Sequence, residues 1–375
     1  MEGKTAIVFG TRPEIIKLAP LIKRCQKKGY PFFTVHSGQH YSYEMDSVFF
    51  EQLGLEKPDY RLSVKSKAPY MQGWHTGRMM EEIEQAILKE KPSNVVAEGD
   101  TNTVLAAALV TAKIGTVKQL VDFSPKFGHV EACLRSYDKT MPEEMNRVIA
   151  DHVSDYLFAP TESAKQNALK EGLSEKKIFV TGNTIVDALK MVEPEIEKAN
   201  SLEQLKLEEK NFALLTLHRQ ENVDAREKLQ SILNGVSAFC KKSGLEALWP
   251  IHPRAKKMLG HFGIPVPEGI RVVEPLGFFE FLSLEKNAAI ALTDSGGVQE
   301  ETCIFGTKCV TLRENTERPE TVRIGANAIA GWKEESIVEC AGRMLAGRKG
   351  HWKQPFGDGN AGKKIMEILE KGGNV

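Results

Sequence analysis

The chain has 375 residues, a length that favours two domains, each large enough to bury a core. Its 50 basic and 50 acidic residues balance, which excludes a general electrostatic attraction to nucleic acid or to an anionic membrane. We expect a cytoplasmic protein from the lack of a long apolar run or signal segment, and the six scattered cysteines argue against a zinc site or disulfide framework.

Short apolar runs alternate with longer amphipathic segments along the whole chain. This pattern is typical of parallel sheets covered by helices, so we predict an α/β fold with two doubly wound units. The charged segment 192–210 is expected to be a linker or connecting helix. Because ligands of open α/β sheets bind beyond the carboxyl ends of strands, we expect a cleft between the units. The first helix is expected from Glu14 to Lys28, and the expected strands cover residues 5–9, 32–37, 93–100, 156–160, 177–183, 212–218, 246–252, 270–276, 288–294 and 308–312.

Two motifs of the first unit follow expected strands. GTRPEIIK places Arg12 and Lys17 near the start of the first helix, where cations could meet a phosphate or a carboxylate. A surface arginine next to Pro13, a good first helical residue, explains the same motif equally well. AEGDTN ends a strand with Asp100, which is either a functional carboxylate or a helix N-cap.

Residues 128–147, GHVEACLRSYDKTMPEEMNR, gather a histidine, four carboxylates and two arginines around one proline. A solvated helix face would space such charges at helical intervals, but these lie on both sides of an expected loop. The segment therefore indicates a site.

In the second unit, LTLHRQEN places His218 and Arg219 after a strand, and WPIHPR does the same with His252 and Arg254. A lone histidine is more often structural than catalytic, and the spacing fits no metal-binding motif such as HExxH. We interpret both pairs as anion contacts.

LTDSGGVQEE is the strongest local signal. The strand 288–293 runs into the residues DSGG and then into an expected helix, whose free backbone N–H groups and dipole suit a diphosphate. Glu300 or Glu301 could then accept hydrogen bonds from two ribose hydroxyls. The alternative is a plain strand-to-helix turn capped by Ser295, and we favour the nucleotide interpretation.

PFGDGNAGKK contains GxGxxG and nearly matches GxxxxGK. No strand precedes it, and Lys364 stands where a P-loop needs Ser or Thr, so we reject both the dinucleotide and the P-loop interpretations.

With these motifs collected, the chain resembles the non-hydrolysing UDP-N-acetylglucosamine 2-epimerases. The resemblance extends in order over nearly the whole chain. The matching blocks are FGTRPEIIKLAP, HSGQHY, EGDTN, GHVEA with LRS, MPEEMNR, DYLFAPTE, FVTGNTIVDA, LTLHRQEN, IHPR, LTDSGGVQEE, CVTLRENTERPETV, GAN and FGDGNA.

The resemblance implies a two-domain glycosyltransferase-B arrangement. Residues 1–190 would form an N-terminal Rossmann-like domain, residues 191–355 a UDP-binding domain, and residues 356–375 a helix returning to the first domain. The implied activity is reversible inversion at C2 of UDP-GlcNAc to give UDP-ManNAc, by anti elimination of UDP to a 2-acetamidoglucal and readdition. The family uses no metal and no nicotinamide, and its usual partner is a second copy in a homodimer; polysaccharide biosynthesis is the expected setting.

The resemblance also implies roles for particular residues. Asp100, Glu131 and Glu143 would be the acid–base carboxylates, and His218 would assist the leaving group. Ser295, Gly296 and Gly297 would bind the diphosphate, and Glu301 the ribose. Further substrate contacts would come from Arg12, Lys17, Arg135, His252, Phe278 and Arg313. A second UDP-GlcNAc, acting as an activator, would contact Gln39, His40 and Arg78.

Two features depart from the family pattern. Cys133 stands where the family usually has glycine, and the stretch TVKQLVDFSPKF before Gly128 is longer than the usual connection. A side chain at a glycine position can collide with a ligand or force a backbone shift.

Three other functions compete with this interpretation. A retaining glycosyltransferase would bind a UDP-sugar between similar domains, but it has no obvious task for three carboxylates. A hydrolysing epimerase would release ManNAc and UDP. A nucleotide-sugar sensor with a decayed site would not need the retained acid–base residues.

Overall fold

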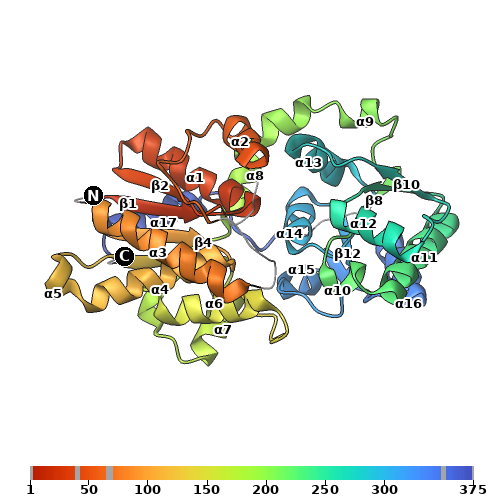
Figure 1. The fold of residues 1–375 in the computed structure, drawn as a ribbon. Coiled ribbons are helices and arrows are strands. Elements are labelled where there is room, and N and C mark those ends of the chain that lie inside the picture. Colours follow the sequence, from red (N-terminus) through yellow and green to blue (C-terminus); the bar gives the residue numbers. More distant parts are fainter. Residues whose placement is uncertain (1–2, 39–42, 65–70, 348–351, 374–375) are drawn as a thin grey trace. The chain divides into compact units, whose positions relative to one another are not determined.

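The computed structural model describes residues 3–38, 43–64, 71–347 and 352–373. The chain divides into two compact units, each an α/β structure in its own right (Figure 1). Unit 1 consists of residues 1–191 together with 356–375, and unit 2 of residues 192–355. The division after Met191 lies inside helix α8 (Thr184–Lys198).

Unit 1 is built on a parallel sheet with the strand order β3-β2-β1-β4-β5-β6-β7. The direction of winding reverses between β1 and β4, which is the switch point where ligands of this architecture bind. The strands are β1 (Thr5–Phe9), β2 (Phe32–His36), β3 (Tyr60–Arg61), β4 (Asn94–Glu98), β5 (Lys126–Val130), β6 (Tyr156–Ala159) and β7 (Ile178–Val180).

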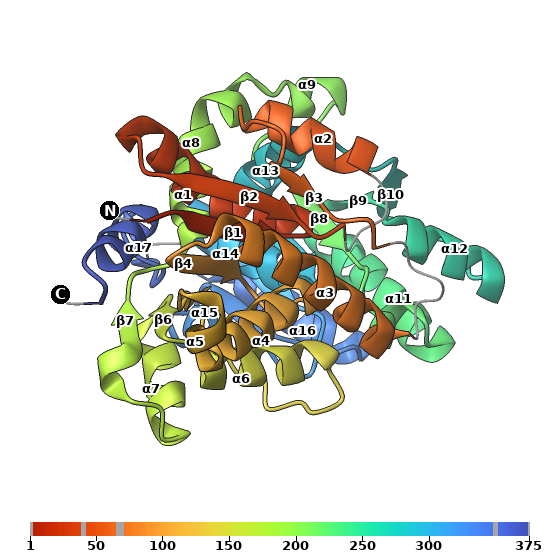
Figure 2. The same cartoon turned by 60° about the vertical axis from the view of Figure 1, so that its left-hand side comes forward.

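Helices cover this sheet and bury its apolar residues. A core of Val, Ile, Ala and Phe side chains joins the sheet to α3 and α4, while α17 packs on α1. Figures 1 and 2 both show α17, near the end of the chain, lying among the first elements of unit 1. Besides α8 and a 3-10 turn (Glu175–Lys177), the helices are α1 (Arg12–Lys28), α2 (Tyr43–Gln52), α3 (Gln72–Glu90), α4 (Asn102–Thr116), α5 (Lys118–Val121), α6 (Pro142–Val153), α7 (Glu162–Lys170) and α17 (Ala361–Glu370).

Unit 2 repeats the architecture with the parallel strand order β10-β9-β8-β11-β12-β13. Its switch point lies between β8 and β11. The strands are β8 (Phe212–Thr216), β9 (Glu246–Pro250), β10 (Ile270–Val273), β11 (Ile290–Thr293), β12 (Lys308–Thr311) and β13 (Asn327–Ile329). The helices are α9 (Ser201–Gln204), α10 (Gln220–Val223), α11 (Arg226–Ser243), α12 (Pro253–Phe262), α13 (Phe278–Asn287), α14 (Gly296–Phe305), α15 (Pro319–Arg323) and α16 (Glu334–Ala346).

The predicted α/β class with parallel sheets is confirmed. The sequence patterns did not predict the short strands β3 and β13, nor β5, whose charged and glycine-containing sequence KFGHV lacks an apolar run. Helix α1 begins at Arg12, two residues before the predicted start, because Glu14 accepts hydrogen bonds from the backbone N–H groups of Gly10 and Thr11 at 2.6 and 2.7 Å. No helix in the described part of the chain is long and apolar enough to cross a membrane.

The glycine-rich segment before α17 has an internal partner. The carboxylate of Asp187 on α8 accepts hydrogen bonds from the backbone N–H groups of Ala361 and Gly362 at 3.1 and 2.9 Å. The first N–H groups of α17 are therefore used to fasten the helix to unit 1.

Helix α17 should contribute strongly to the stability of unit 1. Met366 is fully buried, with its sulfur 3.8 Å from the sulfur of Cys25 on α1. We expect Met366→Ala to lower the free energy of unfolding by about 2–5 kcal/mol because it leaves a cavity in this contact. Urea unfolding followed by circular dichroism measures the change. The control is Lys363→Ala on the exposed face of α17, and equal stability of the two variants would contradict the prediction.

Candidate functional site

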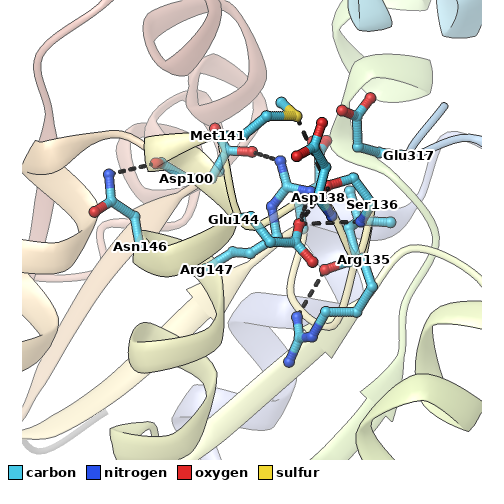
Figure 3. Close-up of polar contacts among 12 residues, drawn as sticks. Asp100, Arg135, Ser136, Asp138, Met141, Glu144, Asn146, Arg147 and Glu317 are labelled. Carbon is cyan, nitrogen blue, oxygen red and sulfur yellow. Dashed lines mark hydrogen bonds and ion pairs between the residues drawn. The ribbon is translucent and has the colours of Figure 1, made fainter. Parts of the chain in front are cut away.

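Asp100 and Glu131 follow two neighbouring strands of unit 1, β4 and β5, which pair in register up to Glu98 and Val130. Asp100 forms an ion pair with Arg147 on α6, and the side-chain amide of Asn146 donates to the backbone carbonyl of Asp100 at 2.9 Å (Figure 3). Both the carboxylate and the backbone of Asp100 are thus fixed by α6.

The first turn of α6 presents two adjacent glutamates with different surroundings. Glu144 is buried and accepts hydrogen bonds from the backbone N–H groups of Ser136 and Tyr137, at 3.0 and 2.8 Å, and from Arg147 at 2.8 Å (Figure 3). Glu143 is partly exposed, and no hydrogen bond or ion pair links its carboxylate to another described residue. Glu144 therefore holds the loop before α6, whereas the acid–base role of Glu143 stays a prediction.

Glu131 is buried at the end of β5 and meets a cation directly. Its Oε2 atom contacts the ammonium group of Lys17 on α1 and accepts a hydrogen bond from the side-chain amide of Asn183 at 2.9 Å. The backbone of Glu131 has a φ of 61°, the left-handed region that costs energy for a residue with a side chain. The surrounding contacts hold the carboxylate in this position.

Cys133 also has left-handed backbone, with a φ of 70°, which explains why glycine would suit this position. Its side chain is fully buried in a small apolar cluster with Ala132 and Leu134, and burial raises the pKa of its thiol. Its backbone N–H donates to both carboxylate oxygens of Asp151, at 3.2 and 3.1 Å. The longer stretch before Gly128 forms the end of α4, the short α5 and the start of β5.

Asp151, on α6, is a fully buried carboxylate at the centre of a chain of charges. It accepts hydrogen bonds from Nδ1 of His129 at 2.7 Å and from Arg135 at 2.6 Å. Burial acts to raise its pKa, but the hydrogen bonds and charges of these two residues prevail and hold the pKa below its usual value. Nε2 of His129 lies 2.7 Å from the carbonyl oxygen of Gly99, so this network of polar contacts also reaches the turn before Asp100.

Arg135, predicted to bind the substrate, belongs to this buried network of polar contacts around Asp151. Its guanidinium group makes a two-point contact with Glu171, at 2.7 and 2.6 Å, in addition to the bond with Asp151. The structure does not bring Arg135 together with Asp100, Glu131 or Lys17, and its substrate role stays a prediction.

In unit 2, His218 follows β8 and is oriented by Asp294, which follows β11. Nδ1 of His218 lies 2.9 Å from a carboxylate oxygen of Asp294, which also accepts hydrogen bonds from the backbone N–H groups of His218 and Arg219 at 3.0 to 3.1 Å. Burial acts to raise the pKa of Asp294, but these partners lower it overall. The ring of His252, the exposed N-cap residue of α12, lies 5.9 Å from that of His218.

The segment after β11 forms a helix N-terminus as predicted. The hydroxyl of Ser295 accepts a hydrogen bond from the backbone N–H of Val298 at 3.5 Å, so Ser295 caps α14, and Gly296 and Gly297 form its first turn. Glu300 is fully buried in an ion pair with Arg318, whereas Glu301 is partly exposed. Of the two glutamates, Glu301 is therefore the more accessible, and its contact with a ribose stays a prediction.

The other predicted binding residues have varied surroundings. Arg313 follows β12 and is buried, with ion pairs to Glu317 and Glu221 at 2.9 and 3.0 Å. Phe278 is buried at the start of α13. Arg12 begins α1, and its guanidinium carbon lies 5.5 Å from the ring centroid of Phe49.

The residues predicted to bind an activator are only partly described. Gln39 and His40 lie outside the described residues. Arg78 is half-exposed on α3, in ion pairs with Glu81 and Glu82 of the same helix.

Sequence reasoning named three carboxylates of unit 1 and Lys17, but it missed Arg147, which pairs with Asp100, and Asn183, which donates to Glu131. Arg147 stands four residues after Glu143 in MPEEMNR, a helical spacing that could have placed both near the first strand ends. LTDSGG contains Asp294, but no local pattern indicates that its carboxylate orients His218. No local signal connects Asp151 with His129, because the contact arises only when α6 packs beside β5.

Comparisons with known proteins agree with one another. The family model described as UDP-N-acetylglucosamine 2-epimerase matches residues 23–370. The UDP-N-acetylglucosamine 2-epimerase of Methanococcus maripaludis is 49% identical over 374 residues, covering 98% of each chain. That of Methanocaldococcus jannaschii is 48% identical over 388 residues, covering 98% of this chain and 99% of the relative. A crystal structure of the latter organism's UDP-GlcNAc 2-epimerase with UDP-GlcNAc and UDP matches with a TM-score of 0.88 at 47% identity, covering 98% and 99% of the two chains.

Asp151 should stabilise unit 1 in a pH-dependent way. We expect Asp151→Asn to lower the free energy of unfolding by about 3–5 kcal/mol at neutral pH, because it breaks buried ion pairs. Since the folded-state pKa is depressed, the stabilisation is present above the unfolded pKa of about 3.9 and disappears as the pH falls through the folded-state value. Urea unfolding at several pH values should therefore show the two proteins converging below about pH 4.

The matched control for this experiment is Glu175→Gln, which removes an exposed ion pair with Lys165 in the same unit and should change stability little. A pH-independent difference between wild type and Asp151→Asn would contradict the assignment of a charged, paired Asp151.

Proposed function

The chain belongs to the UDP-N-acetylglucosamine 2-epimerase family, and we propose that it interconverts UDP-GlcNAc and UDP-ManNAc without releasing free sugar. The proposed route is anti elimination of UDP to leave 2-acetamidoglucal, followed by readdition of UDP with a proton delivered to the opposite face of C2. The Methanocaldococcus jannaschii structure with UDP-GlcNAc and UDP supports the choice of substrate.

One observation carries the chemical part of this proposal. Asp100 and Glu131 stand at the ends of neighbouring strands, each beside a cation, Arg147 for the first and Lys17 for the second. A hydrogen on C2 of a sugar is a poor acid, so its removal needs a positioned carboxylate, and its return to the other face needs a second acid. A pair of oriented carboxylates, with Glu143 as a third, provides both functions.

Unit 2 supplies the groups that the departing UDP requires. Charge develops on the diphosphate as the bond to C1 breaks, and a helix N-terminus and cations stabilise such charge. The N-terminus of α14, capped by Ser295, offers backbone N–H groups. His218 is held at Nδ1 by Asp294, which leaves its Nε2 to interact with the leaving group.

Two alternative enzymes that would also bind UDP-GlcNAc form different products from it. A hydrolysing epimerase would release ManNAc and UDP, and a retaining glycosyltransferase would leave UDP-GlcNAc unchanged without an acceptor. Incubation with UDP-GlcNAc alone, followed by NMR of the products, separates them from the proposed UDP-ManNAc. The homodimer, the activating second UDP-GlcNAc and the polysaccharide pathway remain predictions.

Turnover in D2O tests the elimination step. If the C2 hydrogen leaves on a protein carboxylate that exchanges with solvent, the product must carry deuterium at C2. Proton NMR of one overnight reaction should show this, together with traces of UDP and 2-acetamidoglucal that escape when no covalent bond joins them. Product that retains its C2 hydrogen in D2O would contradict the proposed mechanism.

Replacement of each catalytic carboxylate by its amide should separate catalysis from binding. We expect Asp100→Asn, Glu131→Gln and Glu143→Gln to lower kcat roughly a hundredfold or more, as expected for lost acid–base catalysis, with UDP affinity preserved. Glu301→Ala is the complementary variant and should weaken UDP binding, because a ribose contact exists in the ground state as well. Calorimetric titration with UDP and initial rates with UDP-GlcNAc measure the two effects, and near-normal turnover would remove that carboxylate from the site.

A further inference from the structure

Unit 1 buries a cluster of three carboxyl groups and one ammonium group, in which Glu98 and Glu131 contact the ammonium group and Glu14 acts on Glu98, and the proposed reaction uses only part of this cluster. Glu14, Lys17, Glu98 and Glu131 are 1%, 7%, 2% and 8% exposed. Lys17 and Glu14 lie on α1, Glu98 ends β4, and Glu131 follows β5. The reaction assigns Glu131 to proton transfer and Lys17 to a charged contact, but gives Glu98 no task.

Glu98 and Glu131 share Lys17. The ammonium nitrogen of Lys17 lies 3.3 Å from Oε1 of Glu98 and is in contact with Oε2 of Glu131. Glu131 has further support from the amide of Asn183. Within the described part of the chain, Lys17 is the residue with which the Glu98 carboxyl group forms an ion pair. One cation thus stands between two carboxyl groups on neighbouring strands.

The third carboxyl group adds negative charge without adding a cation. Glu14 accepts hydrogen bonds from the backbone N–H groups of Gly10 and Thr11 and from the hydroxyl of Thr101. If all three carboxyl groups were ionised, Lys17 would leave two negative charges uncompensated in an interior where unpaired charge is costly. The cluster therefore favours keeping protons on its carboxyl groups.

The charged groups that act on Glu98 decide where a proton stays. Burial raises the pKa of Glu98 well above its usual value; Lys17 opposes this rise, while the charges of Glu131 and Glu14 add to it. Burial also raises the pKa of Glu14 to about 7, against its three hydrogen bonds. Glu131 keeps the closer contact with Lys17 and the bond from Asn183, both of which favour its ionised form.

We propose that Glu98 is a positioning residue that holds a proton at neutral pH, leaving the ammonium group of Lys17 to fix the position and charge of Glu131. When Glu98 ionises at higher pH, it competes for Lys17 and disturbs Glu131. This inference rests on the proposed function in one respect, namely that Glu131 takes part in proton transfer at C2.

The variant Glu98→Gln tests the proposal, because an amide resembles a protonated carboxyl group in shape and accepts a hydrogen bond from Lys17 but cannot ionise. The wild-type kcat/KM for UDP-GlcNAc should fall on the alkaline side as Glu98 loses its proton. In Glu98→Gln this alkaline limb should move to higher pH by about one unit or more, with substantial activity retained at neutral pH.

Two control variants accompany this pH profile. Glu98→Asp keeps an ionisable group next to Lys17 and should keep the alkaline limb. Asp187→Asn neutralises a partly buried carboxylate of unit 1 whose hydrogen bonds run to the backbone at the start of α17, and it should also keep the limb. Superimposable profiles for wild type and Glu98→Gln would overturn the proposal while leaving the epimerase function standing.

Infrared spectroscopy gives a readout that does not depend on activity. The difference spectrum between wild type and Glu98→Gln at neutral pH should contain the C=O stretching band of a protonated carboxyl group, which the difference between wild type and Glu98→Asp should largely lack. Absence of the band from the first spectrum would show that Glu98 is ionised and would overturn the proposal. A wild-type protein that converts no UDP-GlcNAc would instead contradict the proposed function, while the band alone decides whether Glu98 holds the proton.

Discussion

The buried carboxylate of Asp151 is the interaction on which the arrangement of unit 1 depends. It forms hydrogen bonds with Arg135, His129 and the backbone N–H of Cys133, and these contacts fix the loop that carries Glu131. The two ring nitrogens of His129 lie 2.7 Å from the carboxylate of Asp151 and 2.7 Å from the carbonyl oxygen of Gly99, so the ring links Asp151 to the turn before Asp100. Two catalytic candidates on different strands are thus held by one connected set of charges.

The same low-dielectric interior produces opposite effects on different carboxyl groups. Asp151 has Arg135 and His129 as hydrogen-bonding partners of its own, and their contribution exceeds the cost of burying its charge. Glu98 shares a single cation with Glu131, and burial dominates its pKa. Both carboxyl groups are almost fully buried, so the number of cations and hydrogen-bond donors around each one accounts for the opposite directions in which their pKa values shift.

Unit 2 also contains a buried aspartate in contact with a histidine, but there the histidine is partly exposed. Asp294 is buried at the end of β11, as Asp151 is buried beside β5, and it accepts two backbone N–H groups together with a histidine nitrogen. Here the histidine is partly exposed, and the buried carboxylate fixes the orientation of its imidazole ring. In unit 1, His129 is itself buried, and its ring lies between the carboxylate of Asp151 and the backbone carbonyl of Gly99. The two rings thus differ in exposure, and only that of His218 is accessible to solvent.

The sequence by itself determined the α/β class, most of the strands and the residues placed directly after them. Alternating apolar and amphipathic segments encode this information locally, and residues after parallel strands necessarily gather at one edge of a sheet. The order of the motifs also identified the family before any geometry was known. Strands β3, β5 and β13 were the exceptions; β3 and β13 are very short, and the glycine and histidine of β5 are buried by neighbours distant in sequence.

Only the tertiary structure decided how the charged side chains pair. Arg135 and Arg147 look alike in the segment 128–147, yet Arg135 enters the interior and Arg147 reaches Asp100. Likewise Glu143 and Glu144 are adjacent, but a rotation of about 100° per residue on α6 sends one toward the loop and leaves the other partly exposed. Ion pairs and protonation states depend on distances between segments far apart in the chain, and no local pattern of residues contains those distances.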